Sequence, residues 1–201
     1  MKERPILFGG AMVRAILAGV NSQTRRVVRI TGGDGIEAHR YVDAFAPYAE
    51  HPGVWEMGES HGGALAHVGS VRCPYGVVGD RLWVRETFAL GTQPRQAFYL
   101  EARLPGHANT LKWRPSIFMP RWASRITLEI TNIRVERLQR ITKDDSRAEG
   151  IGGISVRGED TTRMAFAHLW DTINSKRAPW ASNPWVWVVE FRRIVPAEAA
   201  A

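Results

Sequence analysis

The feature that most constrains the fold is a long stretch of β-strand patterning over Ser124–Leu138. Apolar residues alternate with polar ones up to Ile130, and the alternation resumes in the opposite phase at Ile133. Side chains in a strand point to opposite faces in turn, so a change of phase requires an extra residue. The pattern therefore predicts one long strand or two short ones, with a bulge or bend near Thr131 and Asn132.

Strand and helix patterns alternate along the rest of the chain. Strands are predicted over Arg81–Phe88, after the Gly79-Asp80 turn, and over the Val- and Trp-rich segment Trp185–Ile194. Helices are predicted over Ala11–Ala18, Thr142–Gly150 and Thr162–Asn174. No glycine-rich phosphate loop follows a strand. This order favours an α+β fold with a small mixed β-barrel over a doubly wound sheet.

The length of 201 residues predicts a single domain over residues 1–195, with a frayed tail at 196–201. Periodicity disappears at about 31–70 and 91–110, where both segments are predicted to be irregular insertions. Two prolines within Lys112–Trp122 exclude a regular helix or central strand, so a packed loop is expected there.

The single cysteine, Cys73, excludes an internal disulfide framework and any zinc site built from several cysteines. The six histidines show no metal-binding spacing, so neither a metal nor another cofactor is expected. No apolar run is long enough for a membrane span, and the first residues lack the apolar core of a signal peptide. We therefore expect a cytoplasmic protein without membrane contact.

The charge balance points to a polyanionic partner. The formal net charge is +7, and only four of the 27 basic residues are lysines. Arginine is favoured where planar, bidentate contact with phosphates or base edges is needed, and eight tryptophans can supply stacking surfaces. The composition therefore favours contact with nucleic acid. The alternative explanation is a GC-rich genome, which raises the arginine content without any function.

Few residues have the spacing expected of a catalytic site. Ser22 and Thr24 lie beside Arg25 and Arg26, whose charge could hold a phosphate or stabilise an oxyanion, or the hydroxyls could simply bond to their own turn. Glu149 lies at the end of a short helix, where the helix dipole disfavours a carboxylate. A solvated surface position is the alternative for Glu149.

Glu86 shares a strand face with Leu82 and Val84. An inward carboxylate must either take up a proton or pair with a cation. Since the chain is rich in arginine, we predict a buried ion pair.

Several motifs together resemble the ASCH domain family, in particular the longer members encoded by phages and prophages. The opening motif runs from Ile16 to Arg26, and Cys73–Glu86 resembles the family's central turn and strand. Lys112–Arg125, Ala148–Gly150 and Asn183–Val188 resemble the longer members. Neither 31–70 nor 91–110 is covered.

The resemblance implies a PUA-like β-barrel flanked by short helices, with a cleft for RNA or a nucleoside. Some similar bacterial proteins are amidohydrolases that act on N(4)-acetylcytidine, and others are reported as ribonucleases. The motif places the family's catalytic threonine at Thr24 and its glutamate at Glu149. Its catalytic lysine falls on Asn21, which has no charge to offer, so the resemblance supports the fold more strongly than the reaction.

Three functions are compatible with these motifs. The first prediction is binding of RNA or a modified nucleoside in a cleft formed by Asn21, Thr24, Arg25, Arg26 and Glu149. The alternatives are an active hydrolase and a phage accessory protein that binds a host protein through its insertions. The residues predicted to contact the ligand are Ser22, Arg25, Arg26, Arg85, Arg114, Ser116 and Arg121. If the opening turn is not the site, Arg114, Ser116 and Arg121 are expected to line it.

Overall fold

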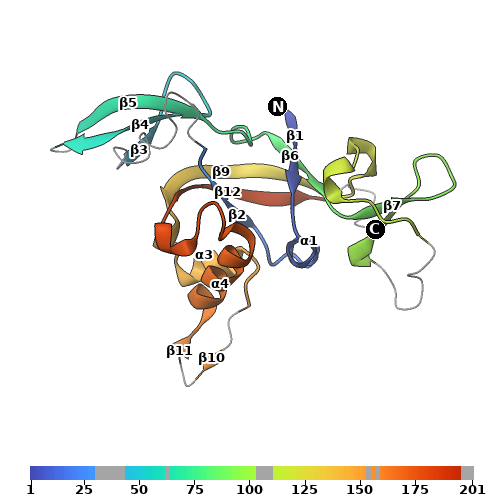
Figure 1. Ribbon diagram of the computed structural model, residues 1–201. Coiled ribbons are helices and arrows are strands. Elements are labelled where there is room, and N and C mark those ends of the chain that lie inside the picture. Colours follow the sequence, from blue (N-terminus) through green and yellow to red (C-terminus); the bar gives the residue numbers. More distant parts are fainter. Residues whose placement is uncertain (30–43, 62–63, 103–110, 153–154, 157–158, 196–201) are drawn as a thin grey trace.

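The computed structural model describes residues 1–29, 44–61, 64–102, 111–152, 155–156 and 159–195. Its centre is a five-stranded sheet with the order β1-β6-β9-β12-β2 (Figure 1). The strands are β1 (Glu3–Leu7), β2 (Gln23–Val27), β6 (Arg81–Arg85), β9 (Thr127–Arg137) and β12 (Trp185–Ile194). β1 is parallel to β6, and the other neighbouring strands are antiparallel. The predicted α+β class is confirmed.

The predicted mixed β-barrel does not close in the described part of the chain, because the sheet ends at β1 and β2 without pairing them. A side chain joins these edges instead: the Arg26 guanidinium donates to the Leu7 carbonyl oxygen over 2.6 Å. Asn21, just before β2, forms an isolated antiparallel bridge with Glu149. The edge of the sheet beside β2 is therefore occupied by the end of a helix rather than by another strand.

The helices are few and short. They are α1 (Gly10–Leu17), α3 (Lys143–Ala148) and α4 (Thr162–Asn174), with 3-10 turns η1 (Leu100–Ala102), η2 (Ser116–Phe118), η3 (Arg121–Ala123), η4 (Leu138–Arg140) and η5 (Trp180–Ser182). A capping box between Thr142 and Asp145 begins α3, and Gly150 ends it in the left-handed conformation with φ +79°. All three predicted helices are confirmed. None of the described helices is long and apolar enough to cross a membrane.

The first face of the sheet is covered by the segment predicted to be irregular. β3 (Ala44–Pro47), β4 (Val54–His61) and β5 (Ala64–Arg72) form a three-stranded antiparallel sheet. Figure 1 shows it on the opposite side of β9 and β12 from α3 and α4. Edge-to-face contacts join Phe45 to Trp185 and Trp55 to Trp187, with ring centroids 4.9 and 5.9 Å apart. The prediction of an irregular insertion is wrong here, because this packing stabilises strands whose own pattern is weak.

The second predicted insertion is also partly ordered. β7 (Phe88–Leu90) pairs with β8 (Ala97–Tyr99), and η1 follows. The strand predicted over Arg81–Phe88 is thus divided in two. β6 ends at Arg85, and Phe88 begins β7 in the separate two-stranded sheet. A further short hairpin joins β10 (Ser155–Val156) to β11 (Glu159–Asp160). Residues 30–43, 103–110 and the tail at 196–201 lie outside the described residues.

The bulge predicted in β9 is confirmed. Glu190 of β12 pairs with Asn132, whereas the next residue, Phe191, pairs with Ile130, so Thr131 is the extra residue. Ile130 and Ile133 consequently contribute to the same apolar core despite their odd spacing.

The second face is covered only in part. Around Val186 and Val188, it packs against α4 through Phe166 and Trp170. At the β1 end, the same face carries the exposed residues Glu3, Pro5 and Leu7 of β1.

Glu86 forms the predicted buried ion pair. Its two carboxylate oxygens accept from Arg125 Nε and from a terminal guanidinium nitrogen, each over 2.8 Å, and Glu86 is 2% exposed. The Arg125 guanidinium also lies 4.2 Å from the centre of the Tyr99 ring. The pair thus ties the end of β6 to the start of β9.

We expect Glu86→Ala to lower the free energy of unfolding by about 3 kcal/mol, because it leaves the Arg125 charge largely buried without a partner. The matched control is Glu129→Ala, which removes an exposed pair with Arg192 and should cost less than about 1 kcal/mol. Chemical denaturation measures both values. Equal losses in the two variants would contradict the structural role assigned to Glu86.

Candidate functional site

The predicted cleft residues belong to a buried ionic network centred on Arg25. The Arg25 side chain has no exposed area, and its guanidinium lies 2.8 Å from Glu149, 2.6 Å from Glu136 and 3.2 Å from Asp145. These carboxylates come from β9 and from both ends of α3. One cation therefore holds an edge strand, a central strand and a helix together.

Arg134 is the second cation of the network. Its guanidinium lies 3.2 Å from Glu136 and 3.0 Å from Asp145, and it also pairs with Glu190 of β12. Gln23 completes the network by donating to Asp145 over 3.2 Å. Two guanidinium groups thus face four carboxylates, and the cluster carries excess negative charge unless a carboxyl group holds a proton.

Glu149 is the carboxyl group best placed to hold that proton. Burial raises its pKa to about 7, although the neighbouring Arg25 and Arg26 act in the opposite direction. By contrast, hydrogen bonds from Thr142 and the charge of Arg25 outweigh burial at Asp145 and keep its pKa below the ordinary value. The two ends of α3 therefore hold carboxyl groups with opposite pKa shifts.

Asn21 is bound to the same helix end. Its side-chain amide donates to the Glu149 carbonyl oxygen over 3.0 Å, and its own oxygen Oδ1 is buried without a hydrogen-bond partner in the described structure. Gly150 allows Ala15 and Asn21 to approach this helix end, because a Cβ there would lie 2.8 Å from the Ala15 Cβ and 3.3 Å from Asn21 Nδ2. Asn21 thus helps to fix the end of α3 against the turn before β2.

Thr24 lies apart from this cluster. It pairs with Val189, whereas Arg25 pairs with Val188, so the two side chains point to opposite faces of the sheet. Thr24 is 1% exposed, and Asn21 and Glu149 are each 5% exposed. The prediction that these residues line an open cleft is wrong: the structure brings Asn21, Arg25 and Glu149 together and leaves Thr24 on the other face.

A shallow groove does lie next to the network. Its volume is about 400 Å³, and its lining includes Ser22, Gln23, Asp144, Asp145 and Glu190. Three of these five side chains are carboxylates, and no lysine or arginine is among the lining residues, so the groove presents no cation to a phosphate. Ser22 is exposed, as a residue that contacts a ligand must be. However, it faces this acidic groove and not a basic surface.

Arg26 is also committed to the protein itself. Its guanidinium binds the Leu7 carbonyl and lies 5.2 Å from the centre of the Phe8 ring. Arg25 is enclosed by carboxylates, so neither arginine of the opening motif presents a free guanidinium. The prediction that these two residues contact a ligand is corrected accordingly.

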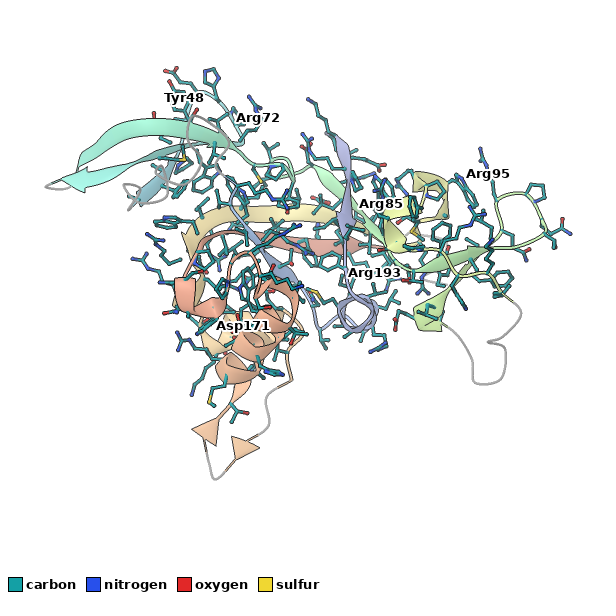
Figure 2. All side chains as sticks on the ribbon, in the orientation of Figure 1. Tyr48, Arg72, Arg85, Arg95, Asp171 and Arg193 are labelled. Atoms are coloured by element: carbon teal, nitrogen blue, oxygen red, sulfur yellow. The ribbon has the colours of Figure 1, made fainter. Side chains whose placement is uncertain are left out.

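Two of the other residues predicted to contact a ligand lie together on a different surface from the opening turn. Arg85 and Arg121 lie 4.7 and 6.0 Å from the centre of the Trp83 ring, on the uncovered part of the sheet. Figure 2 labels Arg85 here, well separated from Asp171 of α4. Arg85 forms no ion pair within 4 Å in the described structure, whereas Arg121 pairs with Glu3 over 2.8 Å. Trp83 was not predicted as part of a site, although its place between Arg81 and Arg85 on a strand was a usable signal.

Arg114 and Ser116 lie in the loop that borders this surface. The loop runs beside β6 and β7: Arg114 exchanges backbone hydrogen bonds with Phe88, and Arg121 contacts Trp83. The packed loop predicted from its two prolines is confirmed. We call Arg81, Trp83, Arg85 and residues 111–123 the basic face.

No protein-family model, curated protein or solved structure matches this chain. The resemblance to the ASCH family therefore rests on the sequence motifs.

We expect the stability of the protein to fall as the pH rises from about 4.5 to 7, the interval between the ordinary pKa of a glutamate and that of buried Glu149. The folded state binds the Glu149 proton more tightly than the unfolded state does. Below this interval, the Glu149 proton therefore contributes its full stabilisation to the folded state. This stabilisation, about 3 kcal/mol in total, is lost as the pH rises through the interval.

Glu149→Gln should flatten this dependence, whereas the control Glu129→Gln should preserve it. Free energies of unfolding measured by denaturant titration at several pH values test the difference. Parallel curves for the natural protein and Glu149→Gln would contradict a buried titrating group at this position.

Proposed function

We propose that the protein is an RNA-binding module and that RNA contacts the basic face rather than the opening turn. The observation that carries this proposal is the placement of Arg85 and Arg121 against Trp83 on the uncovered part of the sheet. The acidic groove beside Ser22 is the poorer surface for a polyanion. Sequence composition and surface geometry therefore support the same class of partner.

The physical basis is preorganisation of the guanidinium groups. Contact with an aromatic ring restricts the orientation of an arginine while leaving its charge and hydrogen-bond donors available to phosphate. Trp83 is only 7% exposed, so it acts as the support, and the arginines form the contact layer. Arg81 adds a third guanidinium from the same strand face, next to Glu3 of β1, with which it interacts electrostatically.

Membership of the ASCH family, with a PUA-like arrangement, is part of the same proposal. The motifs around Gly19, Gly79 and Glu149 support it, as does the mixed sheet flanked by short helices. A modified nucleoside within RNA is compatible with this class of partner.

A hydrolase is the weaker candidate. The required threonine, glutamate and lysine positions fall on Thr24, Glu149 and Asn21, and the first of these points away from the other two. The raised pKa of Glu149 is typical of active sites but is equally explained by its burial at the end of α3.

Arg85→Ala should weaken RNA binding and make the slope of log affinity against log salt shallower by about 0.7 to 0.9, the loss of one phosphate contact. Arg147→Ala is the charge-matched control, because Arg147 is an exposed arginine on α3 that pairs with Asp144. Fluorescence anisotropy of labelled RNA across a salt series measures both slopes. Identical slopes for the two variants would remove Arg85 from the interface.

Asn21→Lys discriminates between binding and hydrolysis. Because Thr24 lies on the other face of the sheet, restoring the ammonium group should leave hydrolysis of N(4)-acetylcytidine at background. A chromatographic assay for released cytidine measures this. A tenfold gain that Thr24→Ala abolishes would show instead that the three residues form an active site.

A further inference from the structure

Three large apolar side chains project from the loop of the basic face. Ile117, Phe118 and Trp122 are 58, 70 and 43% exposed, although Met119 between them is buried. Exposed apolar side chains that are grouped in this way commonly mark a binding surface. Their proximity to the arginines of the basic face shows what kind of partner fits.

The loop is built to hold these side chains in place. Pro115 and Pro120 precede the 3-10 turns η2 and η3, whose backbone bonds Phe118 N–H to Pro115 O and Ala123 N–H to Pro120 O are both 3.1 Å long. Met119 and Ala123 pack against Phe88 in a small core of their own. The rings are thus presented from a restrained backbone, which lowers the entropy cost of binding.

The charge of the loop indicates an anionic partner. Residues 111–123 contain Lys112, Arg114 and Arg121 and no acidic residue. Lys112 and Arg114 are exposed and form no ion pair within 4 Å in the described structure. An apolar protein partner has no use for these cations, whereas a nucleic acid offers both phosphates and flat base surfaces.

We propose that the loop binds unpaired nucleotides, with bases stacked on Trp122 and Phe118 and phosphates held by Lys112 and Arg114. This inference rests on the proposed function and adds that the RNA is single-stranded at the contact. Bases in a duplex are already stacked on one another, so only an unpaired base can present its face to an exposed ring. Stacking adds affinity without requiring a particular base.

The test compares one labelled RNA of about 12 nucleotides, within the range of site sizes known for such surfaces, as a single strand and as a duplex. We expect the natural protein to prefer the single strand. Trp122→Ala and Phe118→Ala should each weaken single-strand binding roughly tenfold and leave duplex binding unchanged. Trp122→Phe should retain most of the affinity, because it keeps an aromatic face.

Met164→Ala is the matched control, since Met164 is 71% exposed on α4, outside the basic face. Circular dichroism confirms that each variant folds. The salt slope should not change in the two aromatic variants, because no phosphate contact is removed.

The possible failures can be told apart. If single strand and duplex bind equally and both depend on Arg85, RNA binding stands and the single-strand inference is wrong. If neither RNA binds in a salt-dependent manner, both proposals are wrong. Unchanged RNA binding by Trp122→Ala, together with loss of its binding to vesicles of anionic phospholipid, would identify a membrane surface instead and overturn the inference.

Discussion

The buried charge of Arg25 is the constraint on which the arrangement around the sheet edge depends. A guanidinium removed from water is tolerated only where carboxylates and hydrogen-bond acceptors replace the lost hydration. Here those groups are Glu136, Asp145 and Glu149, which come from a neighbouring strand and from α3. Helix α3 must therefore lie against β2, and the position of α3 closes the turn in which a cleft was expected.

The same requirement divides the arginines of this chain into two groups. Arg25 and Arg134 are surrounded by carboxylates and stabilise the fold, whereas Arg85 lies on an aromatic ring and has no carboxylate partner in the described structure. A positive net charge says nothing about this division, because it counts buried and exposed cations alike. Only the second group remains available to a polyanion.

The covering of the sheet decides where that second group lies. One face is buried by the β3–β5 sheet and α1, and the α4 side of the other face is buried by the second apolar core. The portion beside β1 stays open, and the loop at residues 111–123 borders it with exposed rings and cations. Phosphate contact through arginines and base stacking on exposed rings are thus proposed on neighbouring parts of one surface, which suits a single extended ligand.

Local sequence pattern was enough to predict strands β9 and β12, the bulge near Thr131 and helices α3 and α4. It also predicted the Glu86 ion pair, because an acidic residue on an apolar strand face needs a cation. Only the tertiary structure decided that β3, β4 and β5 form a sheet, since these weakly patterned strands are stabilised by packing against Trp185 and Trp187. It also decided the partners of Arg25, which lie 111 and 124 residues further along the chain at Glu136 and Glu149. The alternation of apolar and polar residues indicates which face of a strand a side chain occupies. Which charged side chain it contacts there depends on how distant segments of the chain pack.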